Sequence, residues 1–314
     1  MTVKYYLQNK KEGFEVRKRK DLKIKPNNNS SDFVMPSFIH GCPAMCAYCY
    51  CARHNKFGNP ITQFSNIDEI LELTIQHSQE VGVKKIENQQ DSFYYVYEIG
   101  EESDLLGPQN IDLANYAMNR LIMDGLFIKT TFATKLSNKH NISKLIDCPR
   151  HRQGRIRVSL MPQKVSSILE PGTCLIKDRI KSIDKIYNKG YEVHINFAPV
   201  IMYNTWVEDY LQLFSDIHNY LESLEVTTRK RIQNQLACEI IFLTHHPKLH
   251  KSNLQWNEEA EKLLWQPNNQ EFKVNKRGGT DILRYKLDIK KPAMKVLFGA
   301  LKKHMPYCTV RYAF

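Results

Sequence analysis

Three cysteines with a fixed spacing are the residues of this sequence best suited to chemistry. Cys42, Cys46 and Cys49 form the pattern C-x3-C-x2-C, in a chain of 314 residues with 8 cysteines. Three thiolates on one loop can bind three irons of a cubane cluster and leave the fourth iron without a protein ligand. That open iron can bind a small chelating molecule, so the spacing predicts a 4Fe–4S centre.

The same segment leaves a second interpretation open. Cys51 offers a fourth thiol, and His40 and His54 flank the loop. A structural zinc ion takes four such ligands in a closed tetrahedron. A zinc-stabilised nucleic-acid-binding protein without catalysis is therefore the alternative.

The elements that must position this loop alternate between apolar strands and amphipathic helices. Strands joined by crossover helices are parallel, so the fold class is predicted as α/β, a partial parallel (β/α)6 barrel. The carboxyl ends of barrel strands carry the chemistry, and the cysteine loop follows the first strand. We expect strands at residues 33–40, 83–87, 126–134, 155–162, 191–200 and 236–243, with helices at 66–82, 110–125, 176–190 and 206–224.

The pattern changes at both ends of this alternation. Residues 1–31 are basic and turn-rich, which predicts a loosely structured N-terminal arm before a barrel at 32–245. Residues 246–314 are predicted as a C-terminal extension for substrate binding. It contains a helix, a hairpin around Gly278-Gly279, a second helix and a final strand.

The cysteine spacing resembles that of the radical S-adenosylmethionine superfamily, which has an aromatic residue before the last cysteine, here Tyr48. Within it, the chain resembles the spore photoproduct lyase family from about residue 33 onwards. The matching stretches are "CAYCY" (46–50), "ATK" (133–135), "RVSLMP" (157–162), "ILEPGTCLIKDRIKSIDKIYNKGYEVHINFAPVI" (168–201) and "MPYCTVRYAF" (305–314).

The resemblance implies a reaction and its site residues. A reduced 4Fe–4S cluster on the three cysteines would cleave S-adenosyl-L-methionine and release a 5′-deoxyadenosyl radical. Roles carried over from the motifs are contact with S-adenosylmethionine for Ser92, Lys135, Ser159 and Ala198, binding and radical control for Tyr48 and Tyr50, and lesion contact for Arg284 and Tyr285.

One family feature is missing from the sequence. The family has a cysteine after the second strand, in E-A-x-C-T-S-D, that returns a hydrogen atom to the substrate radical. Counting from Glu87 places Gln90 at that position, and an amide cannot replace a thiol there. Cys51 or Cys174 is then the candidate thiol, or the reaction ends in another product.

Charge and context suggest the substrate. The formal charge is +12 and the pI about 9.2, which attracts polyanions. Together with this charge, the resemblance implies action on a thymine-type pyrimidine in DNA, as repair or base modification, with a free nucleotide or another small molecule as the alternative. His245, at the end of the sixth strand, can contact substrate, although a satisfied structural histidine is equally compatible. An electron donor such as flavodoxin or ferredoxin and a cytoplasmic location, with no membrane association, are expected.

Overall fold

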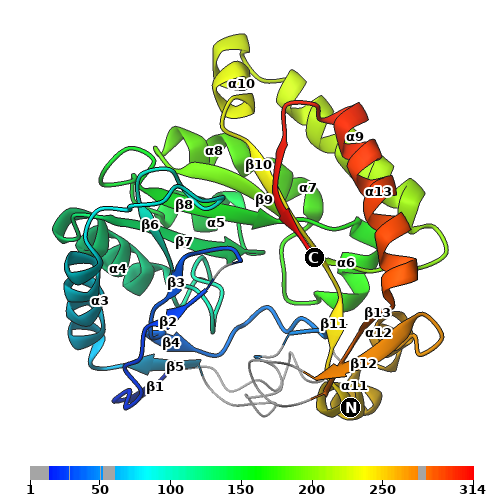
Figure 1. The fold of residues 1–314 in the computed structure, drawn as a ribbon, viewed down its shortest axis with the longest axis horizontal. Coiled ribbons are helices and arrows are strands. Elements are labelled where there is room, and N and C mark those ends of the chain that lie inside the picture. Colours follow the sequence, from blue (N-terminus) through cyan, green and yellow to red (C-terminus); the bar gives the residue numbers. More distant parts are fainter. Residues whose placement is uncertain (1–13, 28, 50, 52–60, 275–280) are drawn as a thin grey trace.

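The main feature of the computed structural model is one curled, mostly parallel sheet of eight strands (Figure 1). The structure describes residues 14–27, 29–49, 51, 61–274 and 281–314. The strand order is β14-β10-β9-β8-β7-β6-β3-β2, and only β2 is antiparallel to its neighbour. Its strands are β2 (Lys25–Pro26), β3 (Phe33–Val34), β6 (Tyr95–Glu98), β7 (Ile128–Thr134), β8 (Gly154–Ser159), β9 (Glu192–Val200), β10 (Ala237–Phe242) and β14 (Thr309–Ala313).

Helices connect the parallel strands and cover the outer face of the sheet (Figure 1). The predicted α/β class, a partial parallel (β/α)6 barrel, is confirmed by the consecutive parallel strands β3, β6, β7, β8, β9 and β10. The helices between them are α3 (Ile67–Val81), α4 (Ile111–Asp124), α5 (Lys139–Lys144), α6 (Gln163–Leu169), α7 (Ile176–Ile180), α8 (Ile183–Asn188), α9 (Trp206–Glu222) and α10 (Val226–Gln233).

Apolar periodicity explains how the helices attach. On α9 the buried residues recur every three or four positions, the spacing of one helix face. Each buried large apolar side chain contributes about 1.5–3 kcal/mol relative to exposure. The buried face of α9 consists of Tyr210, Leu213, Phe214, Ile217 and Leu221.

The barrel interior is lined by charged side chains at alternating strand positions. On β8, Arg155, Arg157 and Ser159 point to one face and mark a lower, a middle and an upper level. At the middle level Arg157 pairs with Glu98 and, at 3.2 Å, with Glu239. At the lower level the ion-paired residues are Asp91, Lys129, Arg155, Glu192 and His194.

The two edges of the sheet are joined across this interior. Ser30 Oγ donates a hydrogen bond to Glu239 Oε2 at 2.9 Å and contacts the Tyr312 hydroxyl at 3.2 Å. Below it, Arg311 donates to the side chain of Gln90. The polar groups at the lower and middle levels are therefore largely ion-paired, although Arg155 Nε and Nη1 and Arg157 Nε have no hydrogen-bond partner among the described residues.

Two predicted strands differ in the structure. The strand expected at 33–40 divides into β3 and β4 (Ile39–His40), and β4 belongs to a separate small sheet with β1 (Phe14–Arg17) and β5 (Ile61–Phe64). The strand expected at 83–87 is wrong. Lys84 is buried there and its Nζ lies 3.1 Å from Asp32 Oδ2, an ion pair that holds an irregular loop before β6.

Two further expectations were only partly right. The helix expected at 176–190 is interrupted between α7 and α8. The loosely structured arm is wrong for the described part of residues 1–31, because β1 pairs with β5 and β2 pairs with β3. Arg19 also donates to Glu102 Oε2 at 2.9 Å, which ties this segment to the barrel.

The C-terminal segment returns to the barrel sheet. The predicted hairpin is formed by β12 (Gln270–Val274) and β13 (Asp281–Tyr285), with β11 (Thr244–His245) on the other side of β13; Gly278-Gly279 lies outside the described residues. The helices are α11 (Pro247–Trp256), α12 (Glu258–Leu264) and α13 (Leu287–His304). Strand β14 then pairs in parallel with β10. The division at residue 245 stays a prediction.

Within the described ranges, none of the helices is both long enough and apolar enough to cross a bilayer.

Candidate active site

The cysteine loop is fixed by the segment that joins α6 to α7. Ala47 N–H donates to the Leu169 carbonyl at 2.8 Å, and Gly172 N–H donates to the Ala44 carbonyl at 3.1 Å. A Cβ at residue 172 would lie 2.6 Å from the Pro43 carbonyl oxygen, so glycine permits this approach. Backbone contacts thus place the loop against the carboxyl side of β8.

Cys46 is buried, and Cys42 and Cys49 are partly exposed. Burial raises the pKa of Cys42 to about 12, with further contributions from the Asp104 carboxylate and Cys49. Burial and the Glu170 carboxylate hold the pKa of Cys46 well above its usual value, and Cys49 and Cys42 act in the same direction. The raised pKa values mean that these thiols do not ionise readily by themselves. A bound metal centre would replace the thiol protons and stabilise the thiolates, which are the form that binds metal.

The cysteine trio is not gathered around one point. In the described part of the chain, the one set of three ligand atoms all within 4.8 Å of one another belongs to His245, His250 and Glu261, and not to the cysteines. Two sulfurs that are each about 2.3 Å from one zinc ion are at most about 4.6 Å apart, so the three thiols as they stand do not form a single-zinc site. A cubane cluster binds each thiolate at a separate iron and does not require such close sulfurs.

Tyr48 belongs to the cysteine loop, and a buried ion pair holds its side chain. Its hydroxyl donates to Glu170 Oε1, and Glu170 Oε2 lies 2.7 Å from Arg179 Nη2. Both charged side chains are fully buried. Burial alone would raise the pKa of Glu170, but Arg179 and Lys135 lower it, so the carboxylate is ionised and orients the tyrosine.

Lys135 supplies a positive charge at the end of β7. Its Nζ lies 5.8 Å from the centroid of the Tyr48 ring. Burial is the largest single influence and favours the neutral amine, but Glu170, Cys46 and Cys49 together raise the pKa of Lys135. Its backbone N–H donates to Asp104 Oδ2 at 2.6 Å. The charged ammonium can therefore pair with an anionic group of a ligand next to the cysteines.

Two unpartnered polar atoms lie at the upper level of the barrel interior. Ser159 and Asn196 are paired in register on β8 and β9, and both are buried. Ser159 Oγ and Asn196 Oδ1 have no hydrogen-bond partner among the described residues. Buried polar atoms are normally satisfied, so this pair fits a bound polar ligand. Ala198, half-buried near the end of β9, lies on the same strand face as Asn196.

Gln90 and Ser92 lie at the other end of the barrel, which corrects two predictions. Both residues precede the second strand, because that strand is β6. Arg155 donates to the Gln90 carbonyl at 2.7 Å, and Arg155 is four residues below Ser159 on β8, roughly 13 Å along the strand. Ser92 is exposed and its hydroxyl donates to Glu87 at 2.5 Å. Neither side chain reaches the cysteine loop.

The position of β6 changes what the resemblance implies for the missing cysteine. Counted from the end of β6, the pattern E-A-x-C-T-S-D would fall on residues 98–104, which read EIGEESD, and its cysteine on the exposed Glu101. Ser103 Oγ donates to the Gly41 carbonyl at 2.6 Å, directly before the first cysteine. Asp104 accepts from Thr134 Oγ1 at 2.8 Å. The thiol is still missing, and the residue in its place is Glu101.

The residues predicted to contact substrate differ in exposure. The Nη2 atom of Arg284 lies 3.5 Å from Glu271 Oε1. Because the Arg284 side chain is only half-buried, it can still contact a ligand. Tyr285 is fully buried and its hydroxyl accepts from Met202 N–H at 2.9 Å; it supports the hairpin and does not present its ring outward. His245 is also buried, and its Nε2 lies 2.9 Å from Glu261 Oε1. This contact agrees with the alternative in which His245 is a satisfied structural histidine.

The remaining candidate residues are distributed as follows. Tyr50 and His54 lie outside the described residues. Cys51 is buried directly after the loop. Cys174 is half-buried, and its N–H donates to the Lys135 carbonyl at 3.1 Å, so this thiol-bearing residue lies at the same edge of the sheet as the cysteine loop.

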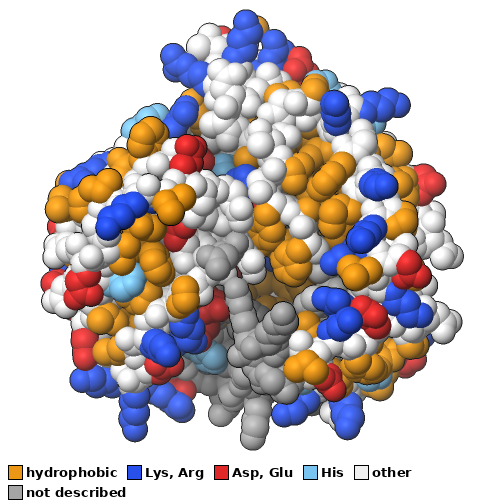
Figure 2. Space-filling view, in the orientation of Figure 1, with side chains coloured by type: hydrophobic (Ala, Val, Ile, Leu, Met, Phe, Trp, Pro, Cys, Tyr) orange, Lys and Arg blue, Asp and Glu red, His pale blue; other side chains and the backbone are white. Residues whose placement is uncertain are grey.

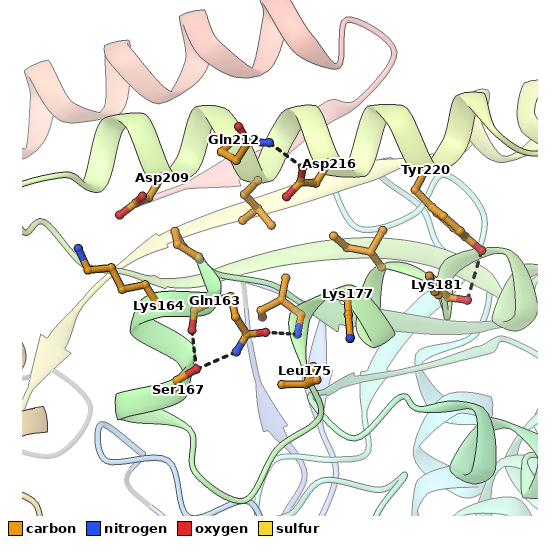
Figure 3. A pocket seen from close by; sticks show the side chains of 14 residues that line it. Gln163, Lys164, Ser167, Leu175, Lys177, Lys181, Asp209, Gln212, Asp216 and Tyr220 are labelled. Carbon is orange, nitrogen blue, oxygen red and sulfur yellow. Dashed lines mark hydrogen bonds between the residues drawn. The ribbon is translucent and has the colours of Figure 1, made fainter.

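A separate pocket lies outside the barrel. It has a volume of about 620 Å³ and is lined by α6, α7 and α9 (Figure 3). Within it, the Gln163 side chain accepts from Ile176 N–H at 2.7 Å and donates to Ser167 Oγ at 2.9 Å. None of its lining residues was predicted for the site. These contacts hold, from outside, the segment that carries Glu170.

Lys and Arg side chains are distributed around the edge of the molecular face in Figure 2 and do not form one patch there. The charge of +12 is thus spread over several elements. Spread charge favours approach of a polyanion without defining its path.

Sequence reasoning missed several residues of the site. Glu170 and Arg179 were quoted within a family stretch but given no role, and a buried ion pair is not visible from spacing. Asn196 is one polar residue in an apolar strand, which was the available signal. Ser103 and Asp104 were missed because the second strand was placed too early.

Comparison with known proteins identifies the family. The model described as spore photoproduct lyase matches residues 2–314. Spore photoproduct lyase of Bacillus subtilis (strain 168) is 25% identical over 237 residues, which cover 74% of this chain and 63% of that protein. That of Geobacillus sp. (strain Y412MC61) is 24% identical over 268 residues, covering 82% and 72%. The chain thus spans less than two thirds of the first of these relatives.

Solved structures agree on the fold. A spore photoproduct lyase variant with dinucleoside spore photoproduct has a TM-score of 0.79 at 21% identity, covering 96% of this chain and 82% of that one. A second variant, with bound AdoMet and dinucleoside spore photoproduct, has a TM-score of 0.78 at 20% identity and the same coverage. The fold and the family match over nearly the whole sequence confirm the resemblance seen in its motifs, and the chain belongs to the spore photoproduct lyase family.

Proposed function

We propose that this protein is a radical S-adenosylmethionine enzyme that acts on a thymine photoproduct or a related modified pyrimidine in DNA. One observation carries the proposal. The cysteine trio lies at the same edge of the sheet as the charged Lys135 and the unpartnered polar atoms of Ser159 and Asn196. Two related enzymes support the substrate class, since their structures contain dinucleoside spore photoproduct.

The residues divide into two binding groups. Cys42, Cys46 and Cys49 would hold a 4Fe–4S cluster, and Lys135 with Ser159 would bind the carboxylate and the ribose of S-adenosylmethionine. When bound, this pair supplies a 5′-deoxyadenosyl radical, provided that an electron donor such as flavodoxin or ferredoxin reduces the cluster.

The protein's own contribution is orientation and the exclusion of water. Glu170 and Arg179 fix the Tyr48 hydroxyl, so the ring presents one face toward Lys135. The paired charges below Ser159 fill the barrel and leave the upper level for ligands. A reactive carbon held there is kept from solvent on the lower side.

The residue that returns a hydrogen atom is the open part of the mechanism. A carboxyl group at Glu101 has no weak bond to hydrogen comparable with S–H, so it cannot quench a carbon radical. We place the thiol of Cys174 in the role of hydrogen-atom donor, because the Cys174 backbone N–H donates a hydrogen bond to the Lys135 carbonyl. If it is too far from the substrate, the reaction ends in a rearranged or oxidised base.

The test follows both products under anaerobic conditions. The protein is reconstituted with iron and sulfide, mixed with dithionite and S-adenosylmethionine, and assayed for 5′-deoxyadenosine and thymine with and without dinucleotide spore photoproduct. We expect substrate to increase 5′-deoxyadenosine, Cys42→Ala to abolish it, and Cys148→Ala to leave it unchanged. Cys148 is the matched control, because its Sγ donates to Arg150 O at 3.0 Å, away from the loop.

Three results would contradict the proposal. A colourless protein with zinc bound by the cysteine loop would favour the non-catalytic alternative. Production of 5′-deoxyadenosine that responds to a free nucleotide but not to the dinucleotide would move the substrate to small molecules. Full thymine recovery in Cys174→Ala would remove that residue from the mechanism.

A further inference from the structure

Two histidines and a glutamate converge in the C-terminal segment, apart from the cysteine loop. His245 ends β11, His250 lies on α11 and Glu261 lies on α12. The Glu261 Oε1 atom is 2.9 Å from His245 Nε2 and 2.5 Å from His250 Nδ1. All three atoms lie within 4.8 Å of one another. Three separate elements therefore direct their ligand atoms to one point.

The surroundings hold these side chains in place. The His250 ring stacks on Trp265 with centroids 3.9 Å apart and an angle of 17° between the planes. Asn253 Nδ2 donates to the second carboxylate oxygen, Glu261 Oε2, at 2.7 Å. The side chains of His245 and Glu261 are at most 2% exposed, and that of His250 is 22% exposed. The group is rigid, nearly dry and reachable from one side.

We propose that His245, His250 and Glu261 bind a divalent transition-metal ion, with zinc as the reference ion. Two imidazoles and one carboxylate are a common zinc donor set, and a solvent molecule on the His250 side would complete the tetrahedron. Ligand atoms about 2.0–2.1 Å from the ion would be roughly 3.3 Å apart, so the two observed separations need to widen by less than an ångström.

Charge favours a cation at this point. An ionised Glu261 is almost fully buried, and a buried carboxylate requires a compensating positive charge. A divalent ion bound by Glu261 and the two imidazoles would supply that charge. His245 Nδ1 has no hydrogen-bond partner among the residues described.

The site connects to the cysteine loop through one side chain. Asn253 Nδ2, which orients Glu261, also donates to the Ala47 carbonyl at 2.9 Å. Ala47 lies between the second and third cysteines of the motif. A bound ion would thus fix the position of the loop from the C-terminal side. The metal site does not depend on the proposed reaction.

Metal analysis of the full chain tests this inference. Protein with a reconstituted cluster is equilibrated with zinc, desalted and measured for zinc and iron. We expect one zinc per chain, its loss in His250→Ala and Glu261→Gln, and no change in iron for either. His218→Ala is the matched control, because His218 contacts Tyr307 on another part of the surface. Asn253→Ala should weaken zinc binding by roughly 10- to 100-fold.

Two further arms separate this site from the cysteines and from misfolding. Zinc must persist when Cys42, Cys46 and Cys49 are all replaced by alanine. Cobalt bound to that cysteine-free protein should show the comparatively intense d–d bands of a tetrahedral ion without sulfur-to-metal charge transfer. This measurement leaves the two histidines unchanged. Absence of zinc from the cluster-loaded wild type, or zinc that disappears with the cysteines, overturns the inference.

Discussion

Replacing Arg179 by methionine tests whether the Glu170–Arg179 pair organises the candidate site. The two side chains are fully buried and 2.7 Å apart. In Arg179→Met, the Glu170 carboxylate keeps its contacts with Tyr48 and with Ser166 Oγ, 3.0 Å away, but loses its directly paired counter-charge and keeps only the weaker influence of Lys135. Removing one partner of a buried ion pair costs about 3–5 kcal/mol of the free energy of unfolding.

That loss is large enough to measure by heat or denaturant. With an unfolding entropy of about 2.1 cal/mol/K per residue, 314 residues give about 0.7 kcal/mol/K, so Tm should fall by about 5–8 °C. The double variant Glu170→Gln/Arg179→Met removes the stranded charge and should recover roughly 2 kcal/mol relative to Arg179→Met.

The assay is urea unfolding of the two single variants, the double variant and one control. Lys189→Met is the control, because Lys189 pairs with the largely exposed Asp147 at 3.3 Å and should cost less than about 1 kcal/mol. The reasoning is refuted if Arg179→Met costs no more than this control. It is also refuted if the double variant loses the sum of both single effects.

Three further predictions concern the glycine at the cysteine loop, the pH dependence of stability, and the position of the missing thiol. Gly172→Ala forces a Cβ against backbone oxygens at 2.6 and 2.8 Å and should lower iron incorporation, whereas Gly299→Ala, with nothing within 4 Å, should stabilise α13 by roughly 0.5–1 kcal/mol in thermal unfolding. Burial first, and neighbouring arginines next, lower the pKa of His194 to about 4. Stability should therefore be complete above pH 6.5 and fall by about 3 kcal/mol as pH drops toward 4, a slope that His194→Gln should remove. Glu101→Cys should raise the yield of restored thymine by product analysis, and Gln90→Cys should not.

The fold was predictable because its signals are local. Apolar residues on α3, α4 and α9 recur at helical spacing, and β7 and β8 are almost wholly buried. Both kinds of element can therefore be recognised from short sequence segments. The cysteine loop was expected after the first strand, and in the structure its backbone contacts the segment after α6, beyond the carboxyl end of β8. Prediction of these helices and strands needs no knowledge of distant contacts.

The misplaced second strand shows where local reasoning ends. Residues 83–87 have strand-like composition, but Lys84 is held by Asp32, more than fifty positions away, and no local pattern reveals that ion pair. The error moved the missing thiol from Glu101 to Gln90. The parallel pairing of β14 with β10 and the partners of Tyr48 depend in the same way on long-range contacts.

The joining of the two sheet edges by Ser30, Glu239 and Tyr312 has a consequence for how a large substrate enters. A curled sheet whose first and last strands are tied together on one side cannot widen there. For the DNA substrate proposed above, a base attached to the polymer would then enter from the cysteine side. The ion-paired side chains at the lower and middle levels would limit how deep that base can go.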